Sequence, residues 1–163
     1  MQINGFHGFP HDTTCLMAAC QKGLSPFVQL LLESEAQADA VNPVRKVGAI
    51  HVAIQNGRLS LMDVLLRFGA DVNLVDDVGR TALHYLISRW NPTVVTSQWW
   101  STFDLLLSHP QIDVNVEDNN ETSPLELAVR KNIPKLVAKL VQAGAILTDN
   151  VREAMQVHMN PFH

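Results

Sequence analysis

The chain has 163 residues, of which 47% are apolar and 17% are charged, and its formal net charge is −4. This composition predicts one folded globular domain and excludes a chain that is disordered throughout. No apolar stretch approaches the roughly 18 residues of a membrane span, and no signal-peptide pattern stands at the N-terminus. We therefore expect a protein of the cytoplasm, the nucleus or both, without a membrane partner.

Basic residues are too sparse for a nucleic-acid partner. The only adjacent basic pairs are Arg45-Lys46 and Arg130-Lys131, whereas a nucleic-acid duplex is bound by a longer basic stripe. We therefore expect no nucleic-acid partner.

The first segment, residues 1–12, holds Phe6 and Phe9 among Gly5, Gly8 and Pro10. We expect a flexible lead here, or a strap that lies over the first structured unit.

Four later segments align with one another, which indicates an internal repeat. The alignment begins at positions 14, 48, 81 and 123, so the intervals are 34, 33 and 42 residues. The aligned segments are residues 15–19, 49–53, 82–86 and 124–128, and the leucine-rich runs that follow them are residues 30–32, 64–66, 105–107 and 139–141. Asp-Val-Asn follows two of these runs, at residues 71–73 and 113–115.

Each repeat predicts a helix, a tight turn, a second helix and an extended loop. The inner helices are expected at residues 13–22, 49–56, 82–90 and 124–131, and the outer helices at residues 25–34, 59–68, 93–108 and 134–142. Gly23 and Gly57 stand where the first helix ends and the chain reverses, a position that favours glycine. One such pair cannot bury its own apolar face, so stacked pairs are expected to share a continuous core.

The period and the motif resemble the ankyrin repeat. Residues 79–84 (Gly-Arg-Thr-Ala-Leu-His) and 69–73 (Gly-Ala-Asp-Val-Asn) match its pattern closely, and residues 123–125 and 143–145 match it in the last unit. The resemblance implies an all-α ankyrin-repeat solenoid of about four helix-turn-helix units with hairpin loops. We place the units at residues 13–46, 47–79, 80–121 and 122–147, followed by a C-terminal capping helix and tail over residues 148–163.

Three departures from the pattern stand in turns. Gly48 replaces the usual threonine of the second unit, Glu121 replaces the turn glycine before the fourth, and residues 35–39 of the first unit lack their glycine. The first and fourth units are therefore expected to act as caps.

The third unit carries an insertion that contains all three tryptophans of the chain, Trp90, Trp99 and Trp100. Asn91-Pro92 predicts an N-cap and the first helical residue, so the outer helix is expected to start near Thr93 and to be about two turns longer than its neighbours. Trp99 falls on the core stripe of this helix, while Trp100 lies to its side and Trp90 at the reversal. Either the three rings pack inside an enlarged outer layer, or Trp90 and Trp100 form an exposed anchor for a partner.

The last segment predicts one more helix over residues 148–158. Asn150 and Glu153 fit a capping box, and Val151, Ala154 and Met155 fall on one face. This helix either closes the last apolar face of the array or docks a partner helix.

No pattern of catalytic or metal-ligating residues is supported. His51 and His84 occupy the histidine position of the repeat, where the resemblance implies a structural hydrogen-bonding role. The chain has no Cys-x-x-Cys pair and no glycine-rich phosphate loop after a strand. We therefore expect no enzyme activity, no metal, no cofactor and no small-molecule substrate.

The hairpin tips carry the clearest charge pattern: Arg45 and Lys46 lie on the first tip, Asp76, Asp77 and Arg80 on the second, and residues 117–121 on the third. They are either ordinary solvated turns or an acidic row that steers a basic partner surface. We assign Tyr85 and Arg89 of the third inner helix to the same surface as these tips. The candidate partner-binding residues are therefore Trp90, Trp99, Trp100, Tyr85, Arg89, Asp76, Asp77, Arg80, Glu117, Asp118 and Asn119.

The predicted partner is another protein. In size and unit number the chain resembles the small all-ankyrin inhibitors of cyclin-dependent kinases and the compact kinase-associated ankyrin regulators of the cell cycle. The resemblance implies a regulatory subunit or inhibitor, foremost of a protein kinase or cell-cycle complex. The alternatives are an inhibitor of Rel-type transcription factors and a passive adaptor or scaffold.

Overall fold

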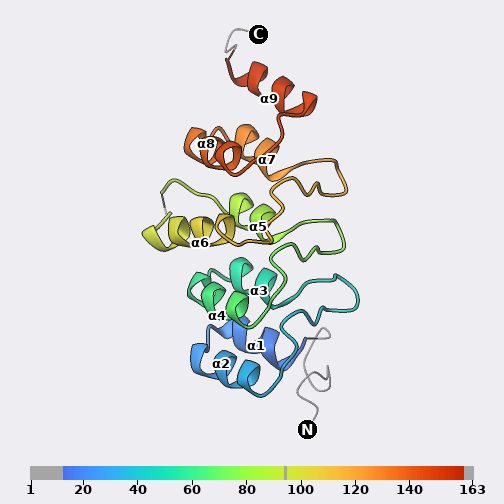
Figure 1. The fold of residues 1–163 in the computed structure, drawn as a ribbon, viewed down its shortest axis with the longest axis vertical. Coiled ribbons are helices and arrows are strands. Elements are labelled where there is room, and N and C mark those ends of the chain that lie inside the picture. Colours follow the sequence, from blue (N-terminus) through green and yellow to red (C-terminus); the bar gives the residue numbers. More distant parts are fainter. Residues whose placement is uncertain (1–12, 94, 160–163) are drawn as a thin grey trace.

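The computed structural model describes residues 13–93 and 95–159, so the expected lead over residues 1–12 and the end of the tail, residues 160–163, lie outside the described part. The helices stack in one direction, with α1 (Cys15–Lys22) at one end of the stack and α9 (Asp149–Met159) at the other (Figure 1). The hairpin loops project from one side of this stack and the outer helices line the other side. The expected all-α solenoid is confirmed.

The helices of the described part alternate between an inner and an outer row. The inner row consists of α1 (Cys15–Lys22), α3 (Ala49–Gln55), α5 (Ala82–Ser88) and α7 (Pro124–Arg130). The outer row consists of α2 (Ser25–Glu33), the 3-10 turn η1 (Leu59–Leu61) with α4 (Met62–Arg67), α6 (Ser97–Leu107) and α8 (Pro134–Gln142), and α9 (Asp149–Met159) ends the stack. Among the described residues, β structure is limited to one isolated bridge between Val41 and Gly48.

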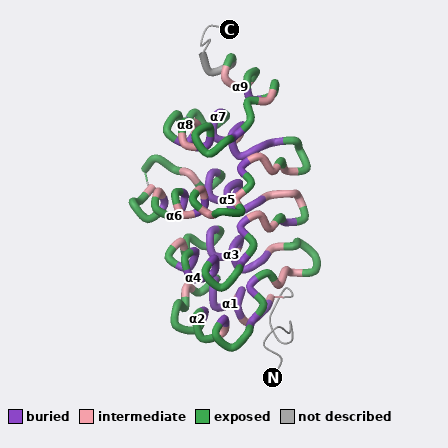
Figure 2. Tube along the Cα trace, in the orientation of Figure 1, coloured by how far each residue is buried: buried purple, intermediate pink, exposed green. Residues whose placement is uncertain are grey.

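The inner helices form the centre of one continuous core, in which α1, α3, α5, α7 and α9 contact each other in that order. Small side chains at the contacts, Ala53, Ala82 and Ala128, are fully buried and let the neighbouring helices approach closely. Figure 2 shows the buried positions as a band through the middle of the stack, with exposed positions on the outer helices and hairpins. Each fully buried leucine contributes about 2 kcal/mol of transfer free energy, so stability is distributed along the array.

The expected start of the third outer helix at Thr93 is wrong. The Asn91 side-chain oxygen accepts hydrogen bonds from the Thr93 amide at 3.0 Å and the Thr93 hydroxyl at 2.7 Å, which closes a local turn. The helix begins at Ser97 instead, where the Thr96 hydroxyl accepts the Trp99 amide at 3.3 Å. Because the inserted residues form a loop, α6 has 11 residues against nine in α2 and α8, so the prediction of a helix about two turns longer than its neighbours is also wrong.

A turn position that has lost its glycine still has the left-handed backbone conformation that favours glycine. Gly79 has φ of +80°, and Glu121, at the equivalent position of the next hairpin, has φ of +58°. A non-glycine residue in this left-handed region costs roughly 1 to 2 kcal/mol, so the hairpin geometry is held by the surrounding repeats.

The last helix, α9, packs against α7 and buries Val151 completely, while Ala154 and Met155 are half-buried against the core. Its N-cap is Thr148 rather than the expected Asn150, because the Thr148 hydroxyl accepts the Val151 amide at 3.4 Å. The helix therefore covers the apolar end of the fourth unit.

Candidate functional site

The hairpin tips are joined to one another by backbone hydrogen bonds. The Asp77 amide donates to the Arg45 carbonyl at 3.0 Å, and the Asn119 amide donates to the Val78 carbonyl at 2.9 Å. The Asn119 side chain adds a bond to the Asp77 carbonyl at 3.2 Å. The tips therefore form a row whose spacing is fixed before any partner binds.

A second ladder runs below the tips and uses one side chain from each of the first three units. The side-chain oxygens of Asp39, Asn73 and Asn115 accept amides of the next unit, those of Asp71 at 2.7 Å, Asp113 at 2.9 Å and Ile146 at 2.8 Å respectively. The asparagine of Asp-Val-Asn is thus a clamp between neighbouring units and is not available for a partner.

Asp76 lies inside the second hairpin rather than on its surface. It is 4% exposed and accepts hydrogen bonds from the Tyr85 hydroxyl at 2.8 Å, the Arg80 side chain at 2.9 and 3.1 Å, and the amides of Val78 and Arg80. Burial acts to raise the pKa of Asp76, but these donors outweigh it and lower the pKa below its ordinary value. Burial, followed by the bond to Asp76, raises the pKa of Tyr85 to about 12.

The structure divides the predicted site residues by exposure. Asp76, Tyr85 and Trp99 are buried, so their side chains do not lie on an exposed partner-contacting surface. The side chains still accessible are those of Asp77, Arg89, Glu117 and Asn119, which are exposed, and Trp90, Trp100, Arg80 and Asp118, which are half-buried. For these eight residues a role in binding remains a prediction.

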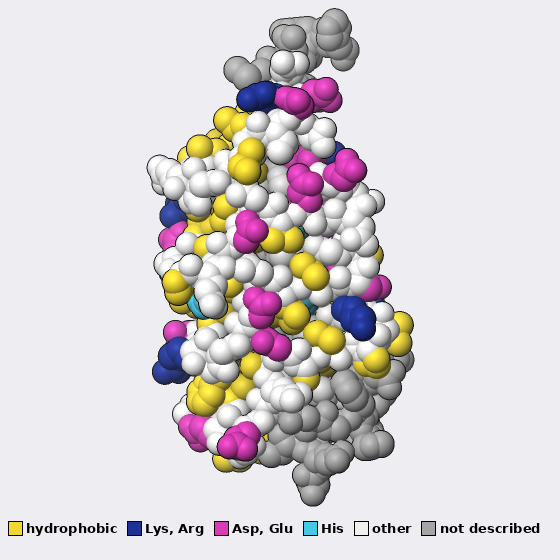
Figure 3. Space-filling model, turned by 45° about the vertical axis from the view of Figure 1, so that its right-hand side comes forward, with side chains coloured by type: hydrophobic (Ala, Val, Ile, Leu, Met, Phe, Trp, Pro, Cys, Tyr) yellow, Lys and Arg dark blue, Asp and Glu magenta, His cyan; other side chains and the backbone are white. Residues whose placement is uncertain are grey.

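The accessible residues do not form one surface. Asp77, Glu117 and Asn119 belong to the tip row, whereas Arg89 caps the opposite end of α5, away from the hairpins. Figure 3 shows acidic side chains spread along the face that includes the hairpin side. The tip row can therefore present carboxylates to a partner, and Arg89 belongs to a separate surface.

A hollow of about 420 Å³ lies between the first hairpin and the inner helices α1 and α3. Its lining includes Arg45 and Val47 from the hairpin and Val52, Gln55 and Asn56 from α3. Sequence analysis missed Val52, Gln55 and Asn56 as candidate contacts. The signal was present, because Val52 and Asn56 stand one repeat before Tyr85 and Arg89 of the third unit.

The three tryptophans pack against each other in the outer layer of the third unit. Their ring centroids are 4.9 to 5.3 Å apart and all three pairs meet edge to face. Phe103 stacks on Trp99 at 5.4 Å, and the Lys135 ammonium lies 4.0 Å from the centre of the Trp100 ring. Trp99 is buried and the other two rings are half-buried, so all three pack in the outer layer, and a role of Trp90 and Trp100 as an anchor for a partner stays a prediction.

The two repeat histidines have the structural hydrogen-bonding geometry that the resemblance implies. His84 Nδ1 accepts the Thr81 amide at 3.2 Å and lies 2.9 Å from the Thr81 hydroxyl, and its Nε2 donates to the Thr122 carbonyl at 2.9 Å. His51 makes the matching bonds to the Gly48 amide at 3.2 Å and the Leu74 carbonyl at 3.0 Å. Burial lowers the pKa of both imidazoles, which keeps them neutral as these bonds require.

Within residues 13–93 and 95–159, no group of three or more His, Cys, Asp and Glu side chains is arranged to hold a metal ion. No helix of the same residues has the length and apolar character needed to cross a membrane.

Comparison with known families gives one matching model, described as ankyrin repeats in three copies. It matches residues 16–97 and again residues 50–151. The two matches together cover most of the chain.

Several curated proteins are similar to this chain. The Nuclear factor NF-kappa-B p105 subunit of Gallus gallus is 29% identical over 138 residues, which is 83% of this chain and 13% of that protein. The Neurogenic locus Notch protein of Drosophila melanogaster is 30% identical over 115 residues, 71% of this chain and 4% of its own length. Rabankyrin-5 of Homo sapiens is 35% identical over 80 residues, 49% of this chain and 6% of its own length. The chain thus spans a small part of each of these relatives.

Proposed function

Since the chain belongs to the ankyrin-repeat family, whose repeats bind other proteins, we propose that it is the regulatory subunit or inhibitor of a protein kinase or cell-cycle complex in the cytoplasm or nucleus. Ankyrin repeats are generally interaction modules without catalytic activity. The chain resembles, in size and unit number, the small all-ankyrin inhibitors of cyclin-dependent kinases and the kinase-associated cell-cycle protein Plutonium. That resemblance favours a kinase over other partners.

The observation that carries the proposal is the fixed row of hairpin tips beside the hollow at α1 and α3. Because hydrogen bonds between units hold the tips in place, a partner meets a surface that is already ordered, and little conformational entropy is lost on binding. Asp77 and Glu117 are exposed on this row. The partner therefore presents a basic surface to the tips and an apolar or amide group to the hollow.

Purified kinases, cyclin-dependent kinases first, test the proposal in two measurements on the full chain, binding and kinase activity. We expect binding together with a change in kinase activity. Binding without any change in activity supports the passive adaptor and contradicts the regulatory role.

Charge reversal at the tips tests the assigned surface. In Asp77→Lys/Glu117→Lys, we expect the association rate with the kinase to fall about tenfold at low salt, with a smaller loss at high salt. Glu33→Lys/Asp63→Lys is the matched control, because it changes the net charge equally on exposed outer-row positions. Equal losses in both double variants would show that only net charge matters and that the tips are not the contact.

A second candidate partner is a Rel-type transcription factor. The similarity to the NF-kappa-B p105 subunit over 83% of this chain favours it. Binding of this chain to a purified Rel-type dimer, with no binding to any kinase tested, would establish the second candidate in place of the first.

A further inference from the structure

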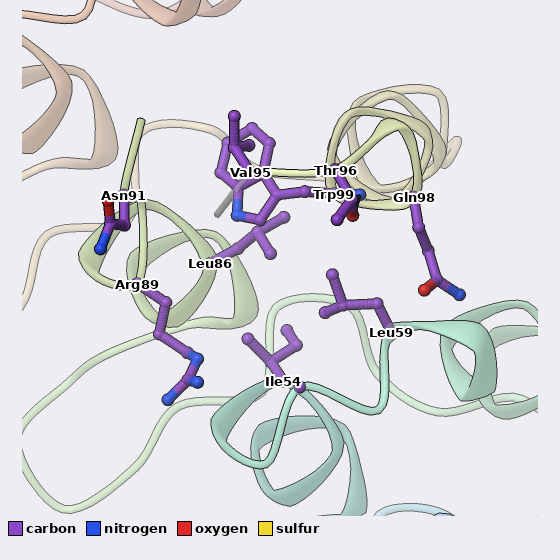
Figure 4. A pocket seen from close by; sticks show the side chains of 10 residues that line it. Ile54, Leu59, Leu86, Arg89, Asn91, Val95, Thr96, Gln98 and Trp99 are labelled. Carbon is purple, nitrogen blue, oxygen red and sulfur yellow. Dashed lines mark hydrogen bonds between the residues drawn. The ribbon is translucent and has the colours of Figure 1, made fainter. Parts of the chain in front are cut away.

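A cavity of about 240 Å³ lies between the second and third units, on the side away from the hairpin tips. Ile54 and Leu59 of the second unit and Leu86 of the third give it apolar walls, and Trp99 covers it (Figure 4). The loop that the insertion forms before α6 borders the cavity with Val95. The cavity is therefore a product of the insertion in the third unit.

Trp99 carries an unused hydrogen-bond donor at this cavity. The side chain is 6% exposed, and Trp99 Nε1 is the one buried side-chain nitrogen or oxygen of the described residues without a hydrogen-bond partner. In Figure 4 the indole nitrogen faces the part of the cavity where Leu86 and Arg89 lie. Because an unpaired buried donor costs about 1 to 3 kcal/mol, native folds normally provide such a group with a partner.

The ring cannot turn to find solvent. Trp90 and Trp100 meet Trp99 edge to face at 4.9 and 5.1 Å, and Phe103 stacks on it at 5.4 Å. The indole N–H is therefore held toward the cavity by the packing of the third unit.

The charge at the cavity is positive. Arg89 lines it, is exposed, and forms no ion pair with any described residue, while no acidic residue is among those that line the cavity. Thr96 and Gln98 also line it, so it borders the first turn of the 11-residue helix α6, whose N-terminal end carries partial positive charge.

At the C-terminal ends of α3 and α5, carbonyl groups near the cavity already accept hydrogen bonds. The C-terminal ends of α3 and α5 also border the cavity, but the carbonyls of Ile54 and Ile87 accept hydrogen bonds from the amides of Gly57 and Trp90 at 3.0 Å each. Their negative partial charge is thus partly compensated by their own turns, and an anionic group remains favoured.

We propose that this cavity binds the carboxylate of a glutamate-type side chain of a protein partner, with Trp99 Nε1–H and the Arg89 guanidinium as donors. The methylene groups of such a side chain fit against Leu59 and Leu86, and its carboxylate reaches the indole N–H and the guanidinium. The site presupposes the protein-binding function proposed above and assigns it a second contact, opposite the hairpin tips.

The test uses the full chain labelled with ¹⁵N, in which each of the three tryptophans has its own indole N–H resonance, and Trp99→Phe identifies that of Trp99. The probe is N-acetyl-glutamate amide, with N-acetyl-glutamine amide as its uncharged match. We expect a saturable downfield shift of the Trp99 indole proton with the glutamate probe and at least fivefold weaker binding of the glutamine probe. Absence of a saturable shift at any soluble concentration, or equal binding of the two probes, overturns the proposal.

Two arginine variants complete the test. Arg89→Gln is expected to weaken binding of the glutamate probe at least fivefold. Arg67→Gln, which removes an exposed guanidinium of α4 outside the cavity, is expected to leave it unchanged. Unchanged binding in Arg89→Gln overturns the proposal. If Arg89→Gln binds the kinase as tightly as the wild type does, the cavity is not a partner contact, but the proposed function stands. If the wild type itself does not bind the kinase, the proposed function is wrong.

Discussion

The second and third units have the same inner helix and hairpin arrangement and differ in the outer layer. Both inner helices are held by a buried histidine, His51 or His84, and both hairpins by an asparagine clamp, Asn73 or Asn115. The outer layer of the second unit is η1 with α4, whereas that of the third is a loop, an 11-residue helix and three packed tryptophans.

The difference shows where this repeat accepts extra residues. In the second and third units the inner helix contacts a helix of the inner stack on both sides, and the hairpin is bonded to a neighbouring hairpin, so an insertion there would break these contacts. The loop before α6 lies in the outer layer, where Pro92 and Thr93 are exposed. Inserted residues there could form new aromatic contacts, and a cavity, without changing the stacking period.

The largest expected effect is the loss of stability when a buried side chain of the outer layer is truncated, and it differs between the second and third units. Phe103 and its repeat counterpart Met62 are both fully buried, but Phe103 also stacks on Trp99. We expect Phe103→Ala to lower the free energy of unfolding by about 4 kcal/mol and Met62→Ala by about 3 kcal/mol, because the lost ring leaves the larger cavity. Urea unfolding followed by circular dichroism measures both.

Equal losses in these two variants would mean that the aromatic cluster adds nothing to the third unit beyond ordinary burial. Ser101→Ala, an exposed position of the same helix, is the control and is expected to change the free energy by less than about 0.5 kcal/mol.

The next largest effect is the loss of stability when either buried histidine of the inner helices is replaced by alanine. His84→Ala removes three hydrogen bonds, to the Thr81 amide, the Thr81 hydroxyl and the Thr122 carbonyl, whereas His51→Ala removes two, to the Gly48 amide and the Leu74 carbonyl. At about 1 kcal/mol for each bond, we expect losses of about 3 and about 2 kcal/mol in the free energy of unfolding. A larger loss in His51→Ala than in His84→Ala would contradict the role given to the Thr81 hydroxyl.

The pH dependence of stability checks the same histidines independently. Burial lowers the pKa of His51 and His84 from 6.5 in the folded chain. When the pH falls below 6.5, the unfolded chain takes up these protons first, so the free energy of unfolding falls as well. We expect His84→Ala to show a shallower fall between pH 7 and pH 5 than the wild type; an identical slope would show that His84 is not held neutral.

The smallest expected effect concerns the hairpin turns before the third and fourth units. Glu121→Gly is expected to raise the free energy of unfolding by about 0.5 to 1 kcal/mol, because it relieves the left-handed backbone at φ of +58°, although glycine also gives the unfolded chain more freedom. Thermal unfolding measures this gain.

The reverse change at the equivalent position is the control. Gly79→Ala is expected to destabilise, since an added Cβ would lie 2.8 Å from Asn119 Oδ1 and 3.0 Å from Asp118 Cα in addition to the strained φ. If Glu121→Gly destabilised as well, a side-chain contact of Glu121 would be supporting the fourth unit.

The sequence by itself determined the repeat, the order of the helices and the structural place of His51 and His84. These features depend on short patterns that recur at a fixed interval, so each unit supports the interpretation of the next. The starts of helices were predicted less well from local capping residues. Asn91 was expected to start a helix, but its side chain closes a turn on Thr93, because the same asparagine group serves either arrangement.

Only the tertiary structure decided which site residues stay accessible. Asp76 is enclosed because Tyr85, nine positions later, reaches back to it, and Trp99 is covered because the loop brings Trp90 against its ring. The cavity between the second and third units is formed by residues from both of them. Burial depends on what neighbouring units place around a side chain, and the pattern within one repeat carries no information about that.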